Sequence, residues 1–221
     1  ARYEEERRLR QESFRQHGGS DERRQLVPGR SWAAWSRAVG LLLPPLDVVD
    51  LGCGEGYLTI EAARWARRVT AVDQSAEVLA RARALASRRK VRNITWKRGR
   101  LERVPLADAS ADVALLSQAL HHADDPARAL AEARRVLRPG GRLLVLDLRA
   151  HQEAWVRETL GDRRLGFDDD ELARLIGDAG FTGVTVRVGA RQVGDPFVVL
   201  IAAGAVPALP ATRGRSTRSR S

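Results

Sequence analysis

The sequence is short of several residue types, and each shortage narrows what the chain can be. Its 221 residues include no methionine and one cysteine, Cys53. A single thiol excludes an internal disulfide framework and any metal site built from several cysteines. No apolar run approaches the roughly 20 residues that a membrane span needs, and the first residues do not resemble a secretory signal. We therefore expect a cytoplasmic protein without membrane contact.

Basic charge is plentiful but unevenly placed. The formal net charge is +10, and only two of the 38 basic residues are lysines, Lys90 and Lys97. Residues 1–30 hold 8 Arg and 6 acidic residues, whereas residues 207–221 hold 4 Arg and no acid. Because the stretch between them is only mildly basic, the charge indicates solubility and weak attraction to polyanions rather than a nucleic-acid site.

Three segments are predicted along the chain. Residues 1–30 are expected to form an N-terminal helix and linker that serves as a lid, 31–206 a single α/β domain, and 207–221 a disordered basic tail. The first segment holds a charged helix over 1–16, and a further helix is expected over 31–43.

From Asp47 onward, strand and helix patterns alternate. Strands are predicted at 47–51, 69–73, 93–97, 112–117, 141–147, 184–189 and 196–203, and helices at 57–66, 76–88, 126–137 and 168–179. The last two strands are predicted to pair antiparallel. The expected fold is therefore a seven-stranded, mostly parallel sheet with one antiparallel strand and helices on both faces.

The most informative segment is residues 48–59, which read VVDLGCGEGYLT. The pattern predicts a buried strand, a tight turn and the start of a helix. The turn contains three glycines at alternate positions: Gly52, Gly54 and Gly56. A dinucleotide fingerprint, G-x-G-x-x-G, requires its third glycine where this chain has Tyr57. This mismatch, together with Asp50 just before the turn, favours a cofactor smaller than a dinucleotide.

Asp73 ends the second predicted strand, 21 residues beyond Gly52. A carboxylate there can accept hydrogen bonds from both hydroxyls of a ribose. Ligands of an open parallel sheet bind beyond the carboxyl ends of the strands, so Asp73 and the glycine turn are expected in one site. There are also structural interpretations: the turn can be a tight strand–helix connection, Asp73 can cap the next helix, and Cys53 can be a small buried filler.

The glycine run resembles motif I of class I S-adenosylmethionine (SAM) methyltransferases, and later segments extend the resemblance. Residues 110–122, Asp125-Pro126 and 135–141 are similar to the branch that includes ubiquinone/menaquinone-biosynthesis and many small-molecule methyltransferases. The resemblance covers about residues 46–147. It implies a Rossmann-like SAM-dependent methyltransferase domain over 31–206, with SAM as cofactor. The implied cofactor contacts are Asp50, Gly52, Cys53, Gly54, Gly56, Asp73, Gln74, Arg100, Leu101 and Ser117.

Position 100 departs from the family pattern. Family members usually carry an acidic side chain there, which accepts a hydrogen bond from the adenine amino group, whereas Arg100 has no acceptor. Adenine recognition is therefore expected from backbone groups near Leu101 or from Glu102.

The flanks carry a narrower resemblance, to bacterial methyltransferase domains fused behind winged-helix repressors of the arsenical-resistance type. It rests on Val27–Trp32 before the domain and on Leu148–His151 and Leu165–Phe167 after it. It implies that DNA is contacted only through a winged-helix domain upstream of Ala1. The missing initiator methionine agrees with a trimmed start or with the later part of a longer chain. A homodimer is left open.

Methyl transfer from a sulfonium is an in-line displacement, which depends mainly on positioning. His121 and His122 follow the fourth strand on the expected substrate side, and one of them is the best candidate for a catalytic base. The alternative is that both are structural. Asp124 and Asp125 follow, but this cluster on one loop has no established ligand spacing, so no metal is expected. Substrate contacts are expected in the N-terminal segment, at Tyr3, Arg30 and Trp32.

The leading functional prediction is a SAM-dependent methyltransferase that acts on a small-molecule acceptor. Arsenic methylation is excluded, because several thiols hold trivalent arsenic and Cys53 is alone. A SAM-binding sensor domain of a transcriptional regulator is the first alternative. Nucleic-acid methylation is the second: Arg213–Arg220 could hold phosphates, but no aromatic residues are interleaved for base stacking.

Overall fold

The computed structural model describes residue 38 and residues 40–159, 161–191 and 196–209. The expected N-terminal helix and lid, most of the helix expected over 31–43, and nearly all of the expected tail lie outside these residues. The elements in chain order are β1 (Asp47–Leu51), α4 (Tyr57–Ala62), β2 (Arg68–Asp73), α5 (Ala76–Arg88), β3 (Ile94–Arg98), β4 (Ala111–Ser117), η1 (Leu120–His122), α6 (Pro126–Val136), β5 (Leu137–Leu148), α7 (Trp155–Thr159), α8 (Asp169–Asp178), β6 (Thr182–Arg191) and β7 (Val198–Ala205).

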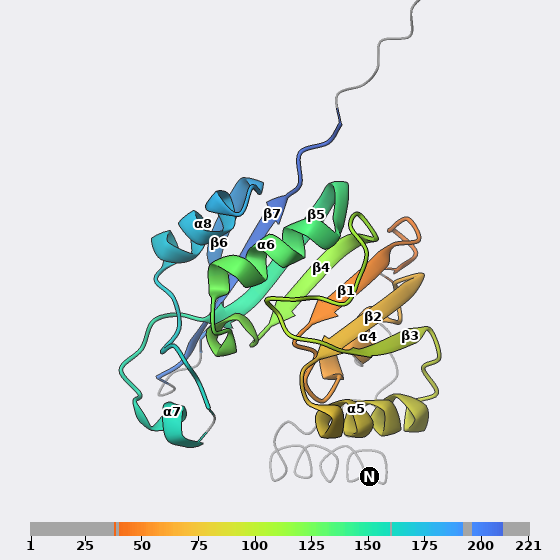
Figure 1. The fold of residues 1–221 in the computed structure, drawn as a ribbon, viewed down its shortest axis with the longest axis horizontal. Helices are drawn as coiled ribbons and strands as arrows, with labels where there is room; N and C mark the ends of the chain where they lie inside the picture. The colour runs from red at the N-terminus through yellow and green to blue at the C-terminus, as the bar shows by residue number, and fades with distance from the viewer. Residues whose placement is uncertain (1–37, 39, 160, 192–195, 210–221) are drawn as a thin grey trace, which may run out of the picture.

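One sheet of seven strands organises the described residues, in the order β3-β2-β1-β4-β5-β7-β6 (Figure 1). The first five strands of this order pair in parallel, whereas β7 is antiparallel to both of its neighbours. The predicted sheet, mostly parallel with one reversed strand, is confirmed. The chain runs outward from β1 to β3 and then returns to β4. The crevice between β1 and β4 is therefore the switch point at which such sheets bind ligands.

Helices cover both faces of the sheet because successive side chains of a strand point to opposite sides. On one face, Leu51 and Leu116 belong to a large core cluster that includes Leu130 of α6 and Leu172 of α8. On the other face, residues of α4 and α5 pack against alternate strand positions such as Val69 and Ala71. In the described ranges, no helix has the length and apolar character required to span a bilayer.

Several element boundaries differ from the prediction. Helix α4 ends at Ala62 rather than Ala66, and β5 begins at Leu137 rather than Gly141. The early start of β5 is explained by pairing of Leu137 with Ala111 and by a hydrogen bond from Gly140 N to Val206 O, 3.0 Å. The short elements η1 and α7 were not predicted, because segments of three and five residues are too short to show a helical period.

A polar cluster holds together the ends of the strands opposite the switch-point edge. The buried carboxylate of Asp47 accepts hydrogen bonds from Arg67 at 2.6 and 3.0 Å, from Arg68 at 3.2 Å and from Arg138 at 3.1 Å. Asp112 of β4 completes the cluster, since it accepts from the backbone N–H of Asp47 at 2.7 Å. The hydrogen bonds from Arg67 lower the pKa of Asp47 although burial opposes them. One carboxylate therefore connects the starts of β1, β2 and β5.

We expect Asp47→Ala to lower the free energy of unfolding by about 2 kcal/mol, because three guanidinium groups lose a buried partner but keep partial hydration. Urea denaturation at pH 7 measures the loss. The native contribution is present above the ordinary pKa of Asp47 and disappears as the pH falls through its lowered pKa. Asp108→Ala is the matched control, since its pair with Arg135 is exposed and should contribute less than about 1 kcal/mol. Equal losses in the two variants would contradict the prediction.

Candidate functional site

A cavity of about 420 Å³ opens at the carboxyl ends of the parallel strands. It is bounded by the segments that follow β1, β2, β3 and β4 and by part of the loop before α8. The residues that line it are Gly52, Gly54, Asp73, Gln74, Val78, Gly99, Arg100, Leu101, Glu102, Gln118, Ala119, His122, Ala123, Asp124, Gly161 and Arg163. Its volume is within the range of small-molecule and cofactor pockets.

The glycine turn lines this cavity, and hydrogen bonds to β2 fix its backbone. The N–H groups of Gly52 and Cys53 donate to Val72 O, at 2.8 and 3.0 Å. Gly52 has φ +73°, and a Cβ there would lie 2.6 Å from the Cβ of Ala119, so the segment after β4 can approach only a glycine. At Gly54 an added Cβ would meet no atom within 4 Å. The turn is therefore open toward the cavity.

Asp73 connects the turn to the next helix. Its Oδ2 accepts from Gly54 N at 3.0 Å and its Oδ1 accepts from Ser75 N at 2.9 Å. The cap of α5 is Ser75, whose hydroxyl accepts from Val78 N at 3.2 Å, and not Asp73. Each carboxylate oxygen of Asp73 keeps capacity for a second hydrogen bond. Asp73 can therefore position the turn and accept from a ligand together.

Four of the predicted cofactor positions do not line the cavity as the structure describes it: Asp50, Cys53, Gly56 and Ser117. Asp50 is buried, and its carboxylate accepts from the hydroxyl of Thr59 in α4. Burial, together with the nearby charge of Asp73, raises the pKa of Asp50 to about 6. Burial also raises the pKa of the Cys53 thiol well above its ordinary value, which agrees with a small buried filler.

Arg100 and its neighbours form a chain of ion pairs at the expected adenine side. The Arg100 guanidinium pairs with Asp124, and Asp124 also pairs with Arg163 at 2.5 Å. Glu102 accepts from Asp124 N at 2.8 Å and lies 3.4 Å from Arg100 Nε. Arg100 is therefore neutralised within the protein. Glu102 and the backbone near Leu101 line the cavity, so both predicted sources of adenine recognition are present there.

The two predicted catalytic histidines occupy different environments. His121 is buried, and its Nδ1 lies 2.6 Å from Oδ1 of Asp147, itself buried in β5. Burial opposes charge on this ring, but the hydrogen bond to Asp147 and the charges of Asp147 and Asp162 outweigh it and raise the pKa of His121. The side chain of His122 is 38 % exposed and lines the cavity. Only His122 is therefore placed to contact an acceptor directly.

Sequence reasoning missed several residues of this region. Gln118, Ala119 and Asp124 line the cavity from the segment after β4, and Gly161 and Arg163 line it from the loop before α8. The position of Gln118, directly after a strand, was a usable signal, whereas nothing in the local pattern marks the loop. The predicted substrate residues Tyr3, Arg30 and Trp32 lie outside the described residues and stay predictions.

The comparisons with known proteins agree on the class of domain. Residues 49–145 match the family model described as a methyltransferase domain. The chain is 44 % identical over 138 residues to the uncharacterized methyltransferase Rv3342 of Mycobacterium tuberculosis, covering 61 % of this chain and 54 % of that one. It is 41 % identical over 100 residues to the ubiquinone/menaquinone biosynthesis C-methyltransferase UbiE of Rubrivivax gelatinosus, covering 45 % of this chain and 38 % of that one. The chain thus spans about half the length, or less, of these relatives.

Solved structures show the same fold. The crystal structure of YcgJ from Bacillus subtilis superposes with a TM-score of 0.63 at 17 % identity, over 80 % of this chain and 98 % of that one. The described residues therefore form a Rossmann-like α/β fold. Residues 49–145 are therefore similar to a methyltransferase domain, and SAM is the cofactor that this similarity implies.

The raised pKa of Asp50, which precedes the glycine turn, predicts how the stability of the protein depends on pH. Because its folded-state pKa exceeds the ordinary value of 3.8, ionising Asp50 destabilises the folded protein as the pH rises from about 4 to about 6. Relative to Asp50→Asn, the native protein should lose about 3 kcal/mol of unfolding free energy across this window. Urea denaturation at pH values between 4 and 7.5 measures the difference. Parallel curves for the two proteins would show that Asp50 does not titrate there.

Proposed function

We propose that this protein is a SAM-dependent methyltransferase whose acceptor is a small molecule. The observation that carries the proposal is the single cavity formed by the open glycine turn, Asp73, Glu102 and His122. Bound SAM would supply a methyl group attached to a positively charged sulfur. The task of the protein is then to hold donor and acceptor in line and to keep bulk water away.

The residues present fit the cofactor. Gly54 leaves the turn open toward the cavity, and Asp73 keeps acceptor capacity for ribose hydroxyls. Glu102 offers a carboxylate at the expected adenine side. The remaining lining, at Gln118, His122 and Arg163, supplies polar groups that can orient an acceptor.

A small acceptor is favoured over a nucleic acid by the chemistry of the lining. Among the residues that the structure describes, the cavity wall includes no Phe, Tyr or Trp. An enzyme that modifies a nucleobase commonly stacks the base on aromatic side chains, and the described part of the wall offers none of these three. We also propose that Tyr3, Arg30 and Trp32 contact the acceptor.

Asp73→Ala should weaken SAM binding at least tenfold, because the variant loses the ribose acceptor and loosens the turn at Gly54 and Ser75. Isothermal titration calorimetry with SAM measures the affinity. Asp178→Ala removes an equal charge from the exposed end of α8 and serves as the control, with an unchanged affinity expected. If the native protein does not bind SAM at millimolar concentration, the proposal fails.

Turnover separates an enzyme from a sensor. The protein incubated with methyl-labelled SAM and fractionated cell metabolites should transfer label to a compound of low molecular mass. Labelled nucleic acid in the same extract would instead support the nucleic-acid alternative. Tight SAM binding with no labelled product in any fraction would contradict the enzyme proposal and support the sensor domain of a regulator.

A further inference from the structure

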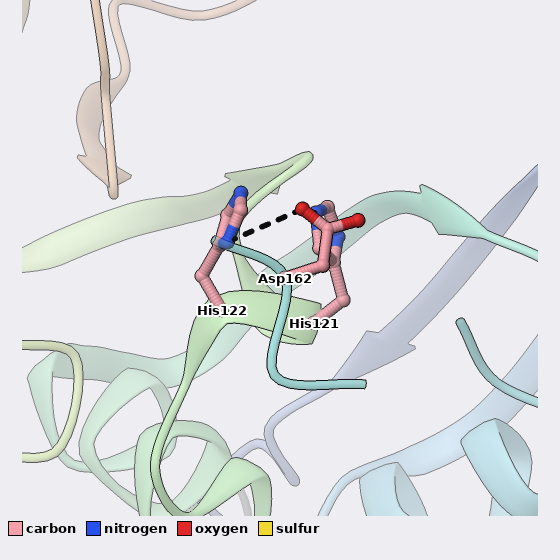
Figure 2. Close-up of side chains that lie close together, drawn as sticks. All are labelled: His121, His122 and Asp162. Atoms are coloured by element: carbon pink, nitrogen blue, oxygen red, sulfur yellow. Dashed lines mark ion pairs between the residues drawn. The ribbon is translucent and has the colours of Figure 1, made fainter. Parts of the chain in front are cut away.

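Three side chains converge beside the cavity from two segments that are far apart in the sequence. His121 and His122 lie on η1, and Asp162 lies in the loop before α8 (Figure 2). Asp162 Oδ1 is 3.7 Å from His121 Nε2 and 3.7 Å from His122 Nδ1. One ligand atom from each residue can be chosen so that all three lie within 4.8 Å of one another.

Asp162 is the unusual member of this group. Its side chain is only 2 % exposed, and neither carboxylate oxygen has a hydrogen-bond partner among the described residues. A buried carboxylate without partners is costly unless a cation compensates it. Among the described residues, its ion-pair contacts are with the two imidazoles, so a carboxylate and two nitrogen donors meet here.

The ring of His121 is oriented by a second carboxylate. Its Nδ1 lies 2.6 Å from Asp147, which also accepts from Leu120 N at 2.9 Å and Leu148 N at 2.7 Å. With the Nδ1 proton donated to Asp147, the lone pair of Nε2 faces Asp162. Metal-ligating histidines characteristically donate their other N–H to a carboxylate in this way.

Main-chain contacts keep the two segments together. The carbonyl oxygen of His121 accepts from Arg163 N at 3.2 Å and from Arg164 N at 3.1 Å. Two of the ligand separations are 3.7 Å, slightly larger than the roughly 3.0–3.5 Å that follows from metal–ligand bonds of about 2.1 Å. Binding of an ion would therefore require the three side chains to move slightly closer together.

We propose that His121, His122 and Asp162 bind one divalent transition-metal ion, through His121 Nε2, His122 Nδ1 and a carboxylate oxygen of Asp162. Two imidazoles and one carboxylate suit Zn²⁺ and its first-row neighbours, whereas Mg²⁺ and Ca²⁺ prefer oxygen ligands alone. Three protein ligands leave at least one coordination position open. In the metal-bound state the ion neutralises the charge of Asp162.

The metal lies at the acceptor side of the cavity, since His122 and Gly161 both belong to its wall. This consequence rests on the proposed function: an oxygen or nitrogen atom of the acceptor can occupy the open position, and metal coordination lowers the pKa of such a group. The chain thus indicates an acceptor with an ionisable O–H or N–H group near the methylated atom.

The sequence-based expectation of no metal considered only His121, His122, Asp124 and Asp125. In the structure Asp124 pairs with Arg100 and Arg163, and Asp125 caps α6 by accepting from Arg128 N at 3.0 Å. Neither belongs to the cluster. The carboxylate that completes it comes from a loop that no sequence spacing connects to η1.

Metal binding is testable without SAM or turnover. The full chain, stripped with a chelator and dialysed against Zn²⁺, should retain one equivalent per chain. Asp162→Asn, which preserves shape, should bind at least tenfold more weakly, and so should His122→Ala, whose half-exposed ring can be removed with little loss of packing. His151→Ala is the matched control and should bind as the native protein does. Stripped protein loaded with Co²⁺ should show the visible absorption bands of a site with nitrogen ligands.

The outcomes separate this proposal from the preceding one. The metal site is overturned if the native protein retains no Zn²⁺. It is also overturned if Asp162→Asn and His122→Ala bind Zn²⁺ as tightly as the native protein does. Calorimetry with SAM on the same variants checks that the cofactor side is intact. Zinc retention without methyl transfer would support the metal site and count against the proposed function. Methyl transfer by metal-free protein would support the proposed function and count against a catalytic role of the metal.

Discussion

The parallel strands β1, β2, β3 and β4 end at the same edge of the sheet, and the arrangement of the site depends on this constraint. The register pairs Leu51 with Val72 and Asp50 with Leu115, so β1, β2 and β4 stop at nearly the same level. Asp73 is the last residue of β2, and the glycine turn and Gln118 directly follow β1 and β4. Their proximity needs no special contact between them, because the hydrogen-bonded ladder already places the chain there.

Carboxylates at the two edges of the sheet have different hydrogen-bond partners. At the amino ends of the strands, Asp47 forms ion pairs with three arginines, which compensate its negative charge. At the carboxyl ends, Asp73 and Asp147 accept mainly from backbone N–H groups. Backbone donors stabilise a carboxylate without cancelling its charge. These carboxylates therefore keep acceptor capacity for hydroxyls, protonated rings or cations.

The parts of the site that were predictable are those that follow from local pattern and chain order. Strand ends, the glycine turn and Asp73 lie within one predicted strand–turn–helix–strand run, so residue types and spacing were sufficient to place them. Asp162 could not be found in this way. Its meeting with His121 depends on how the loop after α7 returns across η1, and that path is determined by packing and by two hydrogen bonds to His121 O. Similarly, the role of Asp50 in holding Thr59 required the path of α4.

Arg100 shows how the chain compensates for its departure from the family pattern. The guanidinium pairs with Asp124, and both residues line the cavity. Asp124 also pairs with Arg163, and this joins the expected adenine side to the loop that carries Asp162. Both arginine side chains are more than half exposed, so solvent weakens each pair. Because these pairs are exposed to solvent, they hold the loop less firmly than the hydrogen bonds that Arg163 N and Arg164 N donate to His121 O.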